Sequence, residues 1–117
     1  MKMLATAEKE NTVRPVAQQI HYTLQAREAE YELLPIAVDQ GVDAVVLSPL
    51  SGGLLSGKYR RDNPEPEGTR KAAQWNEPPL HDVDTLYVVI EVLLAVASHY
   101  ESAATAQTPL AWFLTPP

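Results

Sequence analysis

A glycine- and serine-rich segment followed by a lysine has the residue types that best fit ligand chemistry. Residues 51–57 read Ser-Gly-Gly-Leu-Leu-Ser-Gly, and Lys58 follows directly. Glycines let backbone amides approach a ligand, and clusters of such amides suit phosphate. Lys58 adds one positive charge, and Arg70 adds another after Gly68 and Thr69. These features predict an anion site of the kind that holds a nucleotide phosphate. The same composition also occurs in turns that bind nothing.

Three other groups of polar residues have simpler structural interpretations. His21 has no second metal-type ligand at a useful spacing, which favours a hydrogen-bonded structural role over metal binding. The glutamates within 28–32 are interpreted as a solvated face at the positive end of a predicted helix. The aspartates within 82–84, with His99 and Ser102, have the types of a hydrolase triad. Triads are defined by geometry, and this spacing gives no support for one.

The elements that position the glycine-rich segment are predicted from periodicity and breakers. Residues 16–22 contain Val, Ile and Tyr and predict a strand. Residues 27–40 predict a helix that Pro35 kinks or divides and that Gly41 caps. Residues 44–47, Ala-Val-Val-Leu, predict a strand buried on both faces. The order strand, helix, strand is a parallel βαβ unit with a right-handed crossover. Ligands of such folds bind beyond the carboxyl ends of the strands.

The second half of the chain is predicted to be a long loop followed by helices. Residues 48–82 form the longest irregular stretch, and a loop of that length is usually functional or mobile. Residues 84–99 predict an amphipathic helix. A last helix is predicted to extend from a cap at Ser102 to 114, with Pro109 disturbing its interior. The predicted apolar face of the 84–99 helix comprises Leu86, Ile90, Leu93, Leu94 and Ala97.

Length and composition limit the classes of function. The 117 residues suffice for one domain, predicted over 1–117. The formal net charge of −6 argues against a broad nucleic-acid or anionic-membrane surface, because phosphates demand a basic face. The chain has no cysteine, which excludes disulfides and thiolate metal sites and fits a cytoplasmic location. No apolar run reaches the roughly 20 residues that span a bilayer, and no secretory signal is recognised.

Four segments of the chain resemble the aldo-keto reductase family. The run at 48–59, Ser-Pro-Leu-x-Gly-Gly-Leu-Leu-x-Gly-Lys-Tyr, resembles the loop after the seventh strand of these reductases. Residues 19–35 are similar to the sixth strand and its helix, and 67–70, Glu-Gly-Thr-Arg, resemble a P-x-G-[ST]-R stretch. Residues 106–112 are similar to the helix before the eighth strand. The resemblance is most specific over 16–59. It is strongest to the branch of bacterial general-stress reductases and potassium-channel β subunits.

This resemblance implies a fold, a cofactor and a set of binding residues. The family forms (β/α)8 barrels that reduce aldehydes and ketones with NADPH. By resemblance, Gln19 would hydrogen-bond the nicotinamide carboxamide. Lys58 and Arg70 would contact phosphates, including the phosphate on the adenosine ribose. The residues that would line the pyrophosphate are Ser48, Pro49, Leu50 and Gly52.

The sequence also departs from the family pattern. The family's proton-donor Tyr and its Asp, Lys and His partners lie on the first four strands, which have no counterpart here. Tyr22 and Lys58 belong to other motifs and do not replace that tetrad. The eighth strand and the phosphate-binding segment after it are also without a counterpart. Leu47 stands where the family usually has an aromatic residue that stacks on the nicotinamide. The expected fold class is therefore α/β, a partial (β/α)8 barrel with a parallel βαβ unit and C-terminal helices.

Two functions follow as alternatives. The first is a reductase-like fragment that keeps part of an NADP(H) phosphate site, lacks the catalytic tetrad and is inactive alone. The second is a non-enzymatic structural module that forms homo-oligomers through exposed strand edges, since unpaired edges invite pairing with another chain. A chain re-optimised to fold as a fragment is a third reading that the sequence leaves open. No nucleic acid, membrane or metal is expected as a partner.

Overall fold

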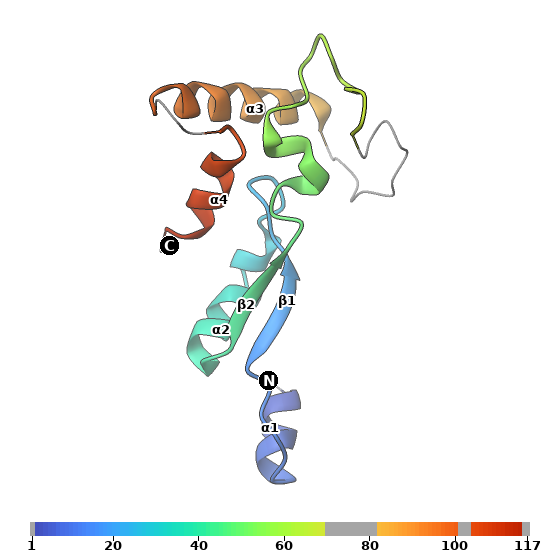
Figure 1. The fold of residues 1–117 in the computed structure, drawn as a ribbon. Helices are drawn as coiled ribbons and strands as arrows, with labels where there is room; N and C mark the ends of the chain where they lie inside the picture. Colours follow the sequence, from blue (N-terminus) through green and yellow to red (C-terminus); the bar gives the residue numbers. More distant parts are fainter. Residues whose placement is uncertain (1, 70–81, 101–103, 116–117) are drawn as a thin grey trace. The chain divides into compact units, whose positions relative to one another are not determined.

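The protein is described by a computed structural model in which residues 2–69, 82–100 and 104–115 are placed (Figure 1). The chain divides by its contacts into two compact units, each described separately below. Three residues near position 24 group with the second unit, although the residues before and after them in the sequence belong to the first. Unit 1 comprises Met1–Tyr22 and Ala26–Leu47, and unit 2 comprises Thr23–Gln25 and Ser48–Pro117. The expectation of a single domain over 1–117 stays a prediction.

Unit 1 contains the predicted βαβ arrangement. Strands β1 (Ala17–His21) and β2 (Asp43–Leu47) pair in parallel, with Ala17 opposite Asp43 and His21 opposite Leu47. Helix α2 (Leu33–Gln40) connects them and lies along the sheet in Figure 1. The predicted α/β fold class with a parallel βαβ unit is confirmed. Helix α1 (Lys2–Lys9) also belongs to unit 1; it precedes β1 in the sequence and buries Leu4 and Ala7.

The segment between the strands breaks where its proline and glycine predict. A short 3-10 turn, η1 (Glu28–Glu30), comes first, and α2 then begins as a separate piece. Pro35 is the third residue of α2, in the first turn, where backbone N–H groups have no intrahelical partner. Gly41 ends the helix at φ 60° and ψ 44°, a left-handed conformation that glycine adopts without a Cβ penalty. Pro35 therefore divides the predicted helix instead of kinking it.

The two faces of the sheet differ in burial. Ile20 is buried, and the Gln18 side chain on the same face donates a 2.9 Å hydrogen bond to the Leu33 carbonyl at the start of α2. The opposite face, called the open face here, is exposed, with Val45 51% and Leu47 50% accessible. The prediction that 44–47 is buried on both faces is therefore wrong. An apolar strand sequence permits burial on both sides, but among the described residues only one face of this sheet is covered. The open face comprises Ala17, Gln19, His21, Asp43, Val45 and Leu47.

Unit 2 packs a 3-10 segment against a long helix. The segment η2 (Ser51–Ser56) lies within the stretch predicted to be irregular, and helix α3 (Val83–Ser98) matches the prediction for 84–99. Helix α4 (Gln107–Phe113) begins later than expected, with Ala106 as its N-cap, and Ser102, the predicted cap, lies outside the described residues. No helix within the described ranges is long and apolar enough to cross a membrane. The buried core consists of Leu54, Leu55, Tyr59, Leu86, Tyr87, Ile90 and Leu93.

Two details of the helices correct the sequence interpretation. Pro109 is the third residue of α4 and is fully buried. It does not disturb the helix interior, because a first-turn N–H would have no intrahelical acceptor. In α3, Tyr87 belongs to the buried face beside the predicted leucines and isoleucine, whereas Leu94 is only partly buried. The aromatic ring widens the apolar face beyond the predicted set.

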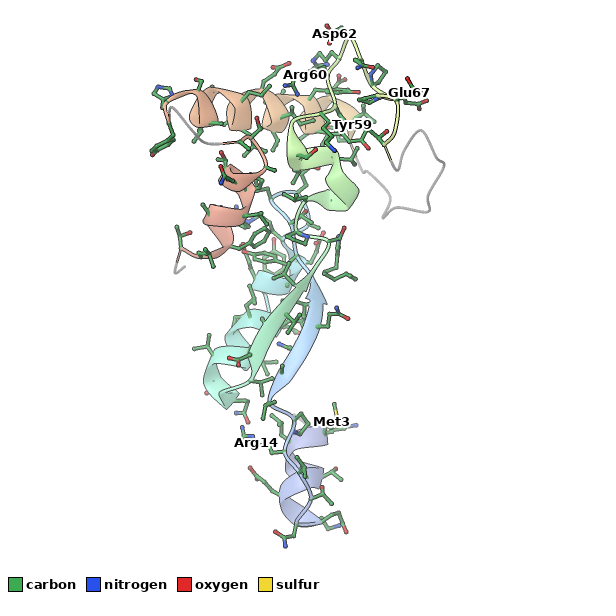
Figure 2. The ribbon with its side chains drawn as sticks, viewed as in Figure 1. Met3, Arg14, Tyr59, Arg60, Asp62 and Glu67 are labelled. Carbon is green, nitrogen blue, oxygen red and sulfur yellow. The ribbon has the colours of Figure 1, made fainter. Side chains whose placement is uncertain are left out.

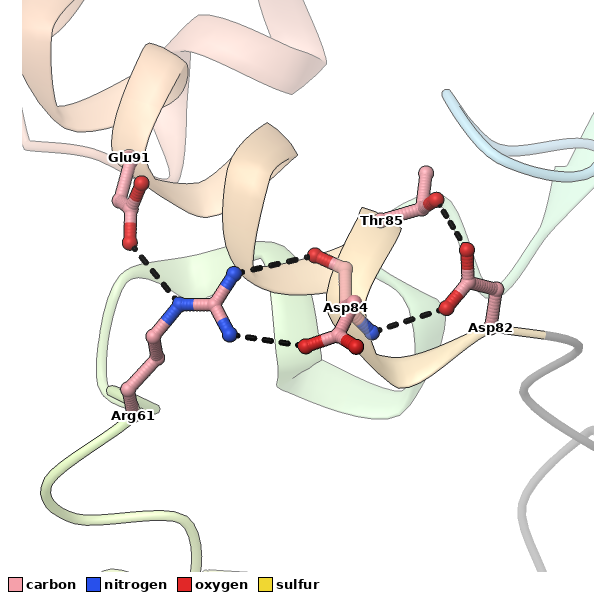
Figure 3. A network of polar contacts seen from close by, with 5 residues as sticks. All are labelled: Arg61, Asp82, Asp84, Thr85 and Glu91. Carbon is pink, nitrogen blue, oxygen red and sulfur yellow. Dashed lines mark hydrogen bonds and ion pairs between the residues drawn. The ribbon is translucent and has the colours of Figure 1, made fainter.

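The acidic residues near the start of α3 have structural roles (Figure 3). Asp82 caps the helix by accepting a 2.9 Å hydrogen bond from the Asp84 backbone amide, and it also accepts from the Thr85 hydroxyl. The Thr85 bonds lower the pKa of Asp82 below its ordinary value. Asp84 and Glu91 both pair with Arg61, at 2.9 and 3.3 Å. These contacts fit helix capping and anchoring of a loop, and Ser102 of the triad pattern lies outside the described residues.

Candidate functional site

A surface hollow of about 500 Å³ lies in unit 2, around η2 and the segment that follows it. It brings together all four loop residues that the resemblance assigns to a pyrophosphate, together with Lys58. It also includes residues from the second motif, near position 68. The glycine-rich segment with Lys58 and the later segment around Gly68 therefore line the same hollow. The hollow is lined by Ser48, Pro49, Leu50, Gly52, Gly53, Ser56, Lys58, Tyr59, Gly68 and Thr69.

The backbone of the glycine-rich segment bends through left-handed conformations. Gly52 and Gly53 have φ of 66° and 99°, values that a residue with a Cβ adopts only at a cost. Ser51 also has a positive φ, of 51°, and is buried. Gly57 ends the segment at φ 83° and ψ 5°. The sequence Ser-Gly-Gly-x-x-x-Gly therefore makes a tight turn that larger residues could not form without strain.

Several amides of this turn are already engaged within the protein. The Ser51 amide donates to the Ser48 carbonyl at 2.8 Å, and the Gly52 amide donates to the Ser48 hydroxyl oxygen at 2.9 Å. The Gly53 and Leu55 amides both donate to the Leu50 carbonyl, at 3.0 and 3.1 Å. The expectation that glycine amides cradle an anion is therefore not met by these four groups. Short loops satisfy their own amides wherever the chain can fold back, because an unpaired buried amide is costly.

Side chains supply the donors that remain in the hollow. The Lys58 side chain is exposed and forms no ion pair with any residue that the structure describes. The Ser56 hydroxyl is buried and has no hydrogen-bond partner among the described residues. A buried hydroxyl without a partner is unfavourable and calls for a ligand or a water. Thr69 is buried and donates its hydroxyl to the Pro66 carbonyl at 2.7 Å. A lysine ammonium and an unsatisfied hydroxyl together suit an anionic oxygen.

The two arginines after Lys58 are committed to other partners. Arg61 pairs with the carboxylates of α3 (Figure 3) and lies 5.2 Å from the centre of the Tyr87 ring. Arg60, labelled with Tyr59 in Figure 2, donates to backbone carbonyls of its own segment. Among the three cationic side chains within residues 58–61, only that of Lys58 has no partner among the described residues. The hollow therefore offers a single lysine to an anion.

Two of the predicted binding residues are not part of this hollow. Gln19 lies in unit 1, exposed on the open face of β1. Arg70 lies outside the described residues, directly after Thr69. Ser56, Tyr59 and Thr69 line the hollow without having been assigned a binding role from the sequence. Ser56 and Tyr59 lie within the 48–59 motif and Thr69 within the 67–70 motif, and this was the one feature of the sequence that pointed to them as residues of the site.

A separate polar cluster in unit 1 joins a tyrosine, a glutamate and an arginine. The Tyr22 hydroxyl donates to the Glu30 carboxylate at 2.6 Å, and Arg27 donates to both oxygens of that carboxylate at 2.7 and 3.0 Å. Glu30 is therefore not simply part of a solvated helix face. The Arg27 and Tyr22 hydrogen bonds lower the pKa of Glu30. Burial and the Glu30 carboxylate raise the pKa of Tyr22 to about 12.

The raised pKa of Tyr22 has a measurable consequence. The neutral phenol is favoured in the folded state, so its contribution to stability is present below the ordinary pKa of 10.0 and is lost as pH rises towards 12. Tyrosinate absorbance is measured as a function of pH for the unmodified protein and for the Tyr22→Phe variant. We expect the difference between the two curves, which reports Tyr22, to have its midpoint near pH 12. Circular dichroism at each pH verifies that the chain stays folded. A midpoint near pH 10 in folded protein would contradict the cluster.

The described residues contain no group of three or more His, Asp or Glu side chains that could hold a metal ion.

Sequence comparisons agree with the resemblance seen in the loop motifs. Residues 1–117 match the sequence profile of the aldo/keto reductase family. An uncharacterised oxidoreductase of Bacillus subtilis, YrpG, is 46% identical over 72 residues, which is 62% of this chain and 21% of that protein. Aflatoxin B1 aldehyde reductase member 2 of Rattus norvegicus is 38% identical over 56% of this chain and 18% of its own length. A putative voltage-gated potassium channel subunit beta of Schizosaccharomyces pombe is 43% identical over 55% and 18%. The matched segments thus span about a fifth of each relative's length.

Proposed function

Because this chain belongs to the aldo/keto reductase family over residues 1–117, we propose that its hollow binds a phosphate group of NADP(H). The observation that carries the proposal is the meeting of Lys58 and the Ser56 hydroxyl, neither of them paired within the described residues, in one hollow. The neighbouring Ser48, Pro49, Leu50 and Gly52 would line the pyrophosphate. Arg70, next to Thr69 in sequence, would add a second cation.

The donor set supports a phosphate better than a neutral ligand. A lysine ammonium is a point charge with three donors, and it commonly binds phosphates. The buried Ser56 hydroxyl gains a partner when an anionic oxygen reaches it. The Ser48 hydroxyl accepts from the Gly52 amide through its oxygen, so its own proton is available to donate. The amides within 51–55 add little, because internal acceptors engage them.

The proposed role of these 117 residues is cofactor binding rather than the chemical step. When bound, NADPH would supply the hydride that reduces a carbonyl compound. Gln19 on the open face is proposed to hydrogen-bond the nicotinamide carboxamide, a role taken from the family resemblance. None of the residues in this chain is proposed as the proton donor. Reduction of an aldehyde, as the rat relative's name describes, would need residues in addition to these. A cytoplasmic location is part of this proposal.

Removal of the Lys58 charge is expected to weaken cofactor binding. Lys58→Ala deletes a charge-assisted contact, and the dissociation constant for NADPH should rise at least about tenfold. Isothermal titration calorimetry at low ionic strength measures this change. Because the contact is ionic and partly exposed, the difference should shrink as salt is added.

Lys9→Ala is the matched control. Lys9 is 82% exposed, pairs only with Glu10 among the described residues, and does not line the hollow. The control changes the net charge by the same amount and should leave the affinity unchanged. Equal affinity of the Lys58→Ala variant and the unmodified protein would reject the phosphate site.

Homo-oligomerisation through strand edges is a second candidate. Each strand of the β1–β2 pair has one edge without a strand partner among the described residues, and the apolar Val45 and Leu47 are half exposed. Unpaired edges beside apolar surface favour pairing with another chain. We therefore propose that unit 1 mediates association between copies of this chain.

Val45→Lys should disrupt that association. A lysine at position 45 places a charge on β2, next to its unpaired edge, and charged side chains on edge strands, lysine especially, oppose pairing with another chain. Light scattering should report an oligomer for the unmodified protein and a monomer for the variant. Val38→Lys is the control, because Val38 is exposed on α2. A monomeric unmodified protein at high concentration would rule out this candidate.

A further inference from the structure

The Arg60 side chain donates to the carbonyls of the two residues on either side of Lys58. Its Nη1 atom donates to the Gly57 carbonyl and, at 2.9 Å, to the Tyr59 carbonyl. The side chain is half-buried. Its backbone is also fixed, because its amide and carbonyl both pair with Asn63 at 3.1 Å. One guanidinium nitrogen therefore ties the residue before Lys58 to the residue after it.

The residues on either side of Lys58 are themselves anchored. Gly57 has a left-handed backbone and approaches Thr105 so closely that an added Cβ would lie 2.6 Å from the Thr105 Cβ. Tyr59 is 3% exposed and belongs to the core. Lys58 itself is exposed, and a long lysine side chain loses rotamer freedom when an anion holds it. When the backbone of Lys58 is fixed, its side chain reaches fewer positions, and less conformational entropy is lost when the ammonium binds an anion.

We propose that Arg60 is a positioning residue that holds the backbone of Lys58 in the conformation that binds an anion. This inference rests on the proposed phosphate site. Arg60 does not line the hollow, and its Nη1 is engaged by carbonyls rather than directed at a ligand. Its contribution is therefore made through Lys58 and not by direct contact.

A double-mutant cycle tests this coupling. NADPH affinity is measured by calorimetry for Arg60→Gln, Arg60→Lys and Lys58→Ala, and for each arginine variant combined with Lys58→Ala. Loss of one or two hydrogen bonds should weaken binding about five- to tenfold in Arg60→Gln. Arg60→Lys should also weaken binding, because the shorter and more flexible lysine side chain keeps the charge but does not hold a donor at the position of Nη1. In the Lys58→Ala background, neither arginine change should reduce affinity further.

Each other outcome overturns the inference. Full affinity of Arg60→Lys would mean that positive charge alone suffices. Additive losses in the cycle would mean that Arg60 acts independently of Lys58. If Lys58→Ala weakens binding and both arginine variants bind normally, the phosphate site stands and the positioning role fails. If the unmodified protein binds no NADPH, both fail. Circular dichroism monitors folding, and Arg60→Lys carries the cycle if Arg60→Gln does not fold.

Discussion

Leu55→Ala is expected to destabilise the protein by about 2–5 kcal/mol, a large share of the roughly 5–15 kcal/mol that keeps a domain folded. Leu55 is 0% exposed and lies in η2 at the centre of the unit 2 core. Truncation removes buried methyl groups and leaves a cavity that the surrounding α3 residues can fill only in part. Urea unfolding followed by circular dichroism measures the loss. Because Ser56 is the next residue, the variant should also bind NADPH more weakly.

Leu114→Ala makes the same chemical change at a surface position. Leu114 is 86% exposed, so its truncation should alter the free energy of unfolding by less than about 0.5 kcal/mol. Similar unfolding midpoints for the two variants would show that η2 is not packed against α3 as described.

Gly57→Ala is expected to destabilise the protein through two separate effects. A left-handed backbone at φ 83° costs an alanine about 1–2 kcal/mol. The new Cβ would also lie 2.6 Å from the Thr105 Cβ and 2.8 Å from its Cγ2. Rotation of the Thr105 side chain moves its Cγ2 but not its Cβ, so the backbone must shift, at a further cost of about 1–3 kcal/mol. Thermal and urea unfolding should both report the combined loss.

Gly68→Ala separates the two effects. Gly68 has a similar φ of 73°, but nothing lies within 4 Å of an added Cβ. This variant should lose only the backbone contribution. Adding Thr105→Gly to Gly57→Ala should recover part of the steric loss. Equal losses at Gly57 and Gly68, with no recovery in the double variant, would refute the close approach to Thr105.

Local chemistry made the elements of unit 1 predictable. Ile20 lies in β1, with Val16 and Tyr22 directly on either side of that strand, and the apolar run marks β2. Pro35 and Gly41 act through their own backbone restrictions, so their effects on α2 need no knowledge of the rest of the fold. In unit 2, the periodicity of α3 has the same local character. The bounds of both strands and of α3 match the prediction to within one or two residues, whereas α2 begins at Leu33 and not at residue 27.

Burial and hydrogen-bond partners depend on what packs nearby, and there the sequence was insufficient. Val45 and Leu47 are apolar whether or not a second layer covers them. The loop glycines indicate a tight turn, but not that Leu50 and Ser48 would engage its amides. The motif resemblance located the hollow, including Lys58. The proposed roles of Gln19 and Arg70 stay predictions, because one lies in the other unit and the other is outside the described residues.

The grouping of residues 23–25 with unit 2 determines whether the protein can be cleaved into two stable fragments. These three residues lie between two parts of unit 1 in sequence, yet they group with unit 2, and Thr23 is only 1% exposed. A single proteolytic cut after Leu47 would therefore not release two self-sufficient pieces. The C-terminal piece would lack residues that complete its packing, and the N-terminal piece would expose them. Limited proteolysis at that bond should yield products that remain associated or unfold together, instead of two independently stable domains.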